Sequence, residues 1–151
     1  MKPMDDFFSG KRYAIFGAKA RGRVQGDVLI KALVKAGKSA VAIEADGAEV
    51  KGAEVCRSLA EAGAVDGVIL LPPSPWDEAA AQFTTEAARQ CQAQGMTTLW
   101  LYSAGDPAPA TQIVQDAGLD PTESRCPCLH IEGGGFPHGL HRAIARFFKQ
   151  L

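Results

Sequence analysis

The sequence has almost no net charge and no long apolar run. Its 16 Lys and Arg residues nearly balance 17 Asp and Glu residues, which leaves a formal net charge of −1. Such a chain has no overall field that attracts nucleic acid or an anionic membrane surface. Because no run of roughly 18 apolar residues is present, no membrane-spanning helix is expected. Nucleic-acid binding and a membrane location are therefore not expected.

Cysteine is scarce, with four residues in the whole chain, Cys56, Cys91, Cys126 and Cys128. This scatter is unlike the disulfide framework of small secreted proteins. Acidic residues near the start (Asp5 and Asp6) occupy positions where a signal peptide needs an apolar segment. We therefore expect a cytoplasmic protein whose thiols are free.

Apolar runs typical of buried strands alternate with helical patterns along the chain. Strands are expected at residues 12–17, 39–44, 67–71 and 98–102, with a short one within 50–56 and a last extended run at 124–131. Helices are expected near residues 25–36, 58–62, 74–94, 106–117 and 138–149. No repeat or linker divides the chain, so residues 1–151 are expected to form one domain. The alternation predicts an α/β fold, a three-layer, doubly wound and mostly parallel Rossmann-like sheet.

Three of the predicted helices begin at residues that commonly cap a helix N-terminus. Ser58 and Glu61 fit a capping box. Ser74 is expected as an N-cap residue, with Pro75 at the first helical position. Asp106 followed by Pro107 is expected to open the next helix in the same way.

The first strand ends in a glycine and is followed by a basic loop. Gly17 and Ala18 precede three cations within five residues, Lys19, Arg21 and Arg23. A strand, a short loop and a helix in this order point helix N–H groups and the positive dipole end at a ligand above the sheet. Arginine forks suit a phosphate group. A strongly anionic ligand is therefore expected here, although the cations alone are also compatible with a solvated loop.

Ligands of open α/β sheets bind beyond the carboxyl ends of the strands, where the strand order reverses. This rule adds Glu44 after the second strand, Pro72, Pro73 and Ser74 after the fourth, and Ser103 after the fifth. Residues 17–22 keep the first and last glycine (Gly22) of the dinucleotide pattern G-x-G-x-x-G but lack the middle one. Glu44 is placed to accept ribose hydroxyls, as in NAD-binding proteins, or simply ends its strand in water.

The order of these features resembles that of the small stand-alone CoA-binding domains, which are similar to the CoA-binding domain of the succinyl-CoA synthetase alpha subunit. The matching stretches are residues 13–18 with the basic loop, Gly52 with Ser58 and Leu59, residues 66–73 with the double proline, residues 98–105 with Trp100, and residues 117–119 leading to Arg125 and Cys126. The resemblance implies a Rossmann fold with coenzyme A held by Gly17, Ala18, Lys19, Arg21 and the loop at Pro72 and Pro73.

The chain departs from this family at two positions. Glu44 and Ala45 stand where the family usually has Asn-Pro, and Tyr102 stands where it usually has glutamine. A carboxylate at position 44 repels a phosphate-rich coenzyme unless it faces the ribose. The identity of the nucleotide is therefore left open by the sequence.

Cys126, Cys128 and His130 alternate, so in an extended strand they share one face, with His138 and His141 following. Thiolates and imidazoles are zinc ligands, but a C-x-C pair on a strand spreads its sulfurs about 7 Å apart. We expect these cysteines to be packing residues rather than a metal site or a redox pair. No G-x-S-x-G elbow or other nucleophile arrangement is present.

We therefore predict a binding module for coenzyme A or an acyl-CoA that has no catalytic residues of its own. An NAD- or NADP-binding protein, or a small oxidoreductase or regulatory subunit that uses the same pocket, is the alternative. A homo-oligomer or a partner enzyme that docks on the final helix also stays open.

Overall fold

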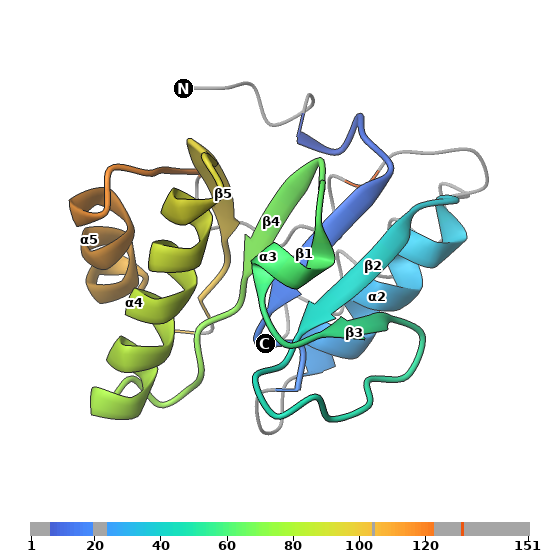
Figure 1. The fold of residues 1–151 in the computed structure, drawn as a ribbon. Helices are drawn as coiled ribbons and strands as arrows, with labels where there is room; N and C mark the ends of the chain where they lie inside the picture. The colour runs from blue at the N-terminus through green and yellow to red at the C-terminus, as the bar shows by residue number, and fades with distance from the viewer. Residues whose placement is uncertain (1–6, 20–23, 104, 123–130, 132–151) are drawn as a thin grey trace.

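The computed structural model describes residues 7–19, 24–103, 105–122 and 131, and the fold is that of an α/β protein with one parallel sheet (Figure 1). Its six strands are β1 (Arg12–Phe16), β2 (Ser39–Ile43), β3 (Glu54–Cys56), β4 (Gly67–Leu70), β5 (Thr98–Leu101) and β6 (Asp120–Thr122). They lie in the order β3-β2-β1-β4-β5-β6, and every neighbouring pair is parallel. The predicted doubly wound sheet is confirmed.

Helices cover both faces of this sheet. Within the described residues, the helices that pack on the sheet are α2 (Val24–Lys35), α3 (Leu59–Ala62), α4 (Glu78–Ala93) and α5 (Ala108–Asp116). Helix α2 packs on one face, whereas α3, α4 and α5 pack on the other (Figure 1). Among the helices of the described residues, none is long and apolar enough to cross a membrane.

Alternation along the strands supplies the two cores. In β1, Tyr13 and Ile15 pack against α2, while Ala14 and Phe16 pack against the opposite helical layer. The same period of two runs through β2 and β4, because successive strand side chains point to opposite faces. A sheet buried on both sides explains why its strands are continuous apolar runs in the sequence.

Residues before β1 complete the core on the α2 side. Phe7 and Phe8 contact the ring of Trp100 on β5, with ring centroids 5.3 and 5.2 Å apart. Both also contact Tyr13, whose hydroxyl donates a 2.9 Å hydrogen bond to the carbonyl of Phe7. Trp100 is fully buried by these contacts.

The start of α4 differs from the prediction. Asp77, not Ser74, is the N-cap residue, and its Oδ1 accepts a 2.8 Å hydrogen bond from the N–H of Ala80. The sequence holds two capping residues three positions apart, and a carboxylate at the second also complements the helix dipole. Ser74 and Pro75 therefore belong to the loop after β4 rather than to the helix.

Helix α5 and the last strand also differ in their bounds. Pro107, expected as the first helical residue, occupies the cap position, and the side chain of Asp106 accepts a 3.0 Å hydrogen bond from the N–H of Ala108. Strand β6 precedes the extended run expected at 124–131, and residues 124–130 lie outside the described ranges. Pro121 is tolerated in β6 because this is an edge strand.

The capping box at α3 is confirmed in part. Ser58 Oγ accepts a 3.2 Å hydrogen bond from the N–H of Glu61. The Glu61 carboxylate accepts from the N–H of Arg57 rather than from that of Ser58. The final helix expected at 138–149 lies outside the described residues.

Candidate functional site

Four central strands end in one row, which places the residues after them side by side. Phe16 pairs with Ile43 on one side and with Leu70 on the other, and Leu70 pairs with Leu101. The next residues along the strands are Gly17, Glu44, Leu71 and Tyr102. The strand order reverses between β1 and β4, so the middle of this row is where a doubly wound sheet binds its ligand.

Gly17 is required at the centre of the row. Its φ is +93°, and a Cβ at this position would lie 2.0 Å from the carbonyl oxygen of Leu71. The N–H of Leu71 donates a 2.8 Å hydrogen bond to the carbonyl of Phe16, which extends the ladder to this point. The chain segments that leave β1 and β4 are thus in backbone contact, with no side chain between them.

The residues after Gly17 differ in what they offer a ligand. The side chain of Ala18 is buried in the core, so only its backbone faces the edge, whereas Lys19 is exposed. Gly26, in the first turn of α2, lies against this backbone, because a Cβ there would be 2.2 Å from the carbonyl oxygen of Ala18. Sequence reasoning missed Gly26, although a glycine inside a predicted helix is a signal of close packing.

Glu44 lies beside this loop, in surroundings that disfavour its charged form. Within the described part of the chain, its Oε1 is a buried side-chain oxygen with no hydrogen-bond partner. Burial and the nearby Asp46 carboxylate raise the pKa of Glu44, while the charge and the backbone N–H of Lys19 act in the opposite direction. The structure therefore brings Glu44 and Lys19 together, as expected from their places after neighbouring strands.

Arg57 follows β3 and reaches the loop after β2, which sequence reasoning did not anticipate. Its Nη1 donates a 3.2 Å hydrogen bond to the carbonyl of Ala45. Gly47 closes a turn onto Glu44 with a φ of +70°, and a Cβ there would lie 2.8 Å from Arg57 Nη2. Arg57 was not recognised from the sequence, because its nearness to this loop depends on the pairing of β2 with β3.

The loops after β4 and β5 form the other side of the edge. Pro72 is buried, Pro73 is half-buried and Ser74 is exposed, so these three residues make a wall with one hydroxyl. Ser103 is half-buried, and its Oγ accepts a 3.4 Å hydrogen bond from the N–H of Gly105. These positions agree with the expectation that they lie beyond the strand ends.

The predicted site residues Arg21, Gly22 and Arg23 lie outside the described ranges. The cysteines and histidines that were weighed as a metal site also lie there, namely Cys126, Cys128, His130, His138 and His141. Within the described ranges, no cluster of His, Cys, Asp and Glu is suited to bind a metal ion.

Cys56 and Cys91 are buried free thiols. Burial raises the pKa of Cys91 to about 12, so it is protonated at neutral pH and is not a nucleophile.

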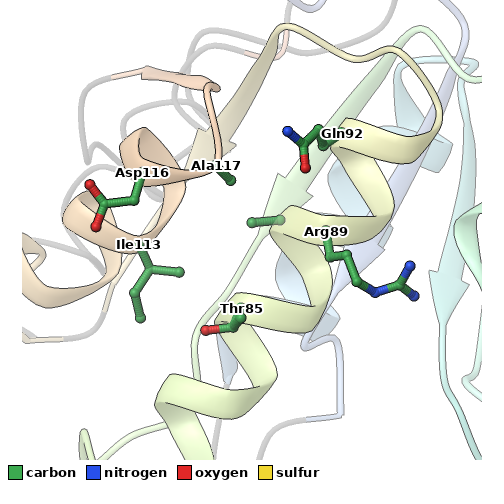
Figure 2. A pocket seen from close by; sticks show the side chains of 7 residues that line it. Thr85, Arg89, Gln92, Ile113, Asp116 and Ala117 are labelled. Atoms are coloured by element: carbon green, nitrogen blue, oxygen red, sulfur yellow. The ribbon is translucent and has the colours of Figure 1, made fainter.

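A groove of about 350 Å³ lies between α4 and α5 (Figure 2). Its lining residues are Thr85, Ala88, Arg89 and Gln92 from α4, Ile113 and Asp116 from α5, and Ala117, which directly follows α5. The charged ends of Arg89 and Asp116 point away from each other in Figure 2, and each already has a partner, Glu86 and Gln112 respectively. The two charged side chains do not converge on this groove, which makes the carboxyl edge the better candidate site.

Solved structures share this fold. A conserved hypothetical protein from Pyrococcus furiosus is 19% identical, with a TM-score of 0.61 over 80% of this chain and 98% of that protein. A protein from Thermus thermophilus is 21% identical, with a TM-score of 0.59 over 82% and 90%. A hypothetical protein from Pyrococcus horikoshii OT3 is 18% identical, with a TM-score of 0.56 over 98% and 97%.

The sequence identifies the family of this protein, which the structural similarities alone do not. No curated protein matches this chain. The model of a family described as a CoA binding domain matches residues 11–132, which include all six strands and every described residue of the candidate site. The chain belongs to this family of CoA-binding domains.

Proposed function

We propose that the protein binds coenzyme A or an acyl-CoA at the carboxyl edge of the sheet, above the junction of β1 and β4. The observation that carries the proposal is the backbone contact of Gly17 with Leu71 at the point of strand-order reversal. A bare backbone there lets a diphosphate approach the N–H groups that follow β1. The family match favours coenzyme A over NAD or NADP.

The basic loop supplies the phosphate contacts in this proposal. Lys19 is exposed beside the edge, and Arg21 and Arg23 are assigned from the sequence as the remaining cations of the clamp, with Gly22 between them. Pro72, Pro73 and Ser74 form the facing wall, and Ser103 extends it. Charge-assisted hydrogen bonds from lysine and arginine are the strongest contacts available to a phosphate.

We further propose that binding occurs without catalysis by this chain. The two described thiols are buried, and burial raises the pKa of each. Asp106 is engaged at the start of α5 by its hydrogen bond from Ala108. These groups are buried or take part in structural hydrogen bonds and do not face a substrate. This supports a binding module.

The test is the melting temperature with and without ligand. We expect coenzyme A at about 100 times its Kd to raise the melting temperature by about 5 °C or more. The double variant Arg21→Ala with Arg23→Ala should lose this shift, because two phosphate contacts are removed. The matched control is Lys31→Ala with Lys35→Ala, which removes the same charge from the exposed face of α2 and should keep the shift.

Two outcomes contradict the proposal. If coenzyme A, an acyl-CoA and dephospho-CoA all leave the melting temperature unchanged at millimolar concentration, the protein is not a coenzyme A binder. If NAD or NADP raises the melting temperature and coenzyme A does not, the pocket holds a dinucleotide instead.

A further inference from the structure

Two oppositely charged side chains follow the last paired residues of β2 and β3. Ile43 pairs with Cys56, and the next residues are Glu44 and Arg57. The N–H of Glu44 donates a 2.8 Å hydrogen bond to the carbonyl of Cys56, so the two strands stay together up to this point. Adjacent parallel strands lie about 4.8 Å apart, so both side chains start within reach of one small group.

Arg57 is held in place without being neutralised. Its guanidinium lies against Gly47 and bonds to the carbonyl of Ala45, a neutral acceptor. The ion pairs among the described residues join Arg12 to Glu54 and Arg89 to Glu86, and Arg57 takes part in neither. A positioned arginine that keeps its full charge and further N–H donors is suited to a phosphate.

Glu44 offers the complementary chemistry. Its Oε1 is buried and has no hydrogen-bond partner among the residues that the structure describes, so it gains most from a ligand that donates a hydrogen bond. The neighbouring Asp46 is engaged by the loop, where its Oδ1 accepts a 2.9 Å hydrogen bond from the N–H of Ala48. A hydroxyl group is a fitting partner for Glu44, whereas a phosphate alone is repelled by it.

We propose that Glu44 and Arg57 recognise the ribose of the coenzyme, with Glu44 accepting a hydrogen bond from its 2′-hydroxyl and Arg57 binding its 3′-phosphate. The inference rests on the proposed function, because coenzyme A carries this hydroxyl and this phosphate on neighbouring ring carbons. It places the adenosine end of the ligand over β2 and β3 and the diphosphate over β1. The repulsion expected between Glu44 and a phosphate-rich coenzyme is offset by Arg57.

The test compares coenzyme A with dephospho-CoA, which differs only in lacking the 3′-phosphate. We expect Arg57→Met to raise the Kd for coenzyme A roughly tenfold and to change that for dephospho-CoA less than about twofold. Arg57→Lys should retain part of the preference, because it keeps the charge without the fork. Glu44→Ala should raise the Kd for both ligands roughly tenfold, since both carry the 2′-hydroxyl.

Arg89→Met is the matched control, because it removes an exposed arginine of α4 that lines the groove between α4 and α5. It should leave both Kd values unchanged, and unfolding without ligand confirms that each variant is folded. Equal weakening of both ligands by Arg57→Met, or no change in either, overturns this inference while coenzyme A binding stands. Failure of the wild-type protein to bind coenzyme A overturns the proposed function and the inference with it.

Discussion

At the scale of single residues, the candidate site depends on a glycine that has two separate reasons to be there. Gly17 has a positive φ, which costs an L-residue about 1–2 kcal/mol. It also leaves no space for a Cβ, because the carbonyl oxygen of Leu71 would be 2.0 Å away. Conformation and close packing can be separated experimentally, since other glycines of the chain have only the first constraint.

Gly17→Ala is expected to lower the free energy of unfolding by about 2 kcal/mol or more, because strain and overlap with Leu71 add. Gly37→Ala is the control, since Gly37 has a φ of +78° but nothing within 4 Å of a Cβ. It should cost about 1 kcal/mol. Urea unfolding measures both, and equal losses would show that the contact with Leu71 does not matter.

Residue-scale chemistry was only partly readable from the sequence. Gly17, Lys19 and Glu44 were predicted at the edge, because each follows an apolar run that ends abruptly. Arg57 and Gly26 were not, since their importance comes from contacts with Gly47 and Ala18 that local patterns do not encode. The roles of the predicted residues in binding stay predictions.

At the scale of elements, one carboxylate joins the starts of β1 and β4. Asp66 Oδ2 accepts hydrogen bonds of 2.7 and 2.9 Å from the N–H groups of Lys11 and Arg12. These two hydrogen bonds are the main cause that lowers the pKa of Asp66; burial opposes them, and the charges of Lys38 and Lys11 add smaller lowering effects. Hydrogen bonds thus join the central strand pair at the end of the sheet opposite the candidate site.

This lowered pKa predicts a pH dependence of stability. Because the folded pKa lies below the unfolded one, the contribution of Asp66 is complete above the usual aspartate value, about 3.9. It is lost as the pH falls through the lower folded value. Asp66→Asn should therefore be less stable than wild type at neutral pH, and the difference should shrink as the pH falls below about 4.

Urea unfolding of both proteins between about pH 7 and pH 3 measures this difference. Asp116→Asn is the control and should keep the wild-type pH profile, because Asp66 is intact in it. A difference between wild type and Asp66→Asn that stays constant with pH would contradict the assigned role.

Element types were predictable and element bounds less so. Apolar runs and glycine stops located the strands β1 to β5 and the helices α2 to α5, but Asp77 replaced Ser74 as the N-cap of α4. Local capping rules accept either residue, and a carboxylate at the second position also complements the helix dipole. The short β6 was missed because Pro121 is an unfavourable strand residue away from an edge.

At the scale of the whole molecule, the segment before β1 is part of the core. Phe7 and Phe8 are both buried, and together they cover Trp100, which lies on β5 more than ninety residues later in the chain. The fold thus depends on residues that precede its first strand, and helical or strand periodicity gave no sign of this.

Phe7→Ala is expected to lower the free energy of unfolding by about 3 kcal/mol or more, because it leaves a cavity between Trp100, Tyr13 and Phe8. Trp76→Ala removes a larger ring that is 36% exposed and should cost about 0.5 kcal/mol. Chemical denaturation compares the two variants. Similar losses would mean that the aromatic cluster is not part of the stabilising core.

The aligned strand ends have a consequence for engineering. Phe16, Ile43, Leu70 and Leu101 are all buried, yet the position directly after each one borders the candidate site. Glu44 follows Ile43 and is half-buried, and Arg57 follows Cys56 and is exposed, so substitutions at these two positions change the candidate site without repacking the hydrophobic interior. A library restricted to positions 44 and 57 would explore new specificities while leaving the buried strand residues unchanged.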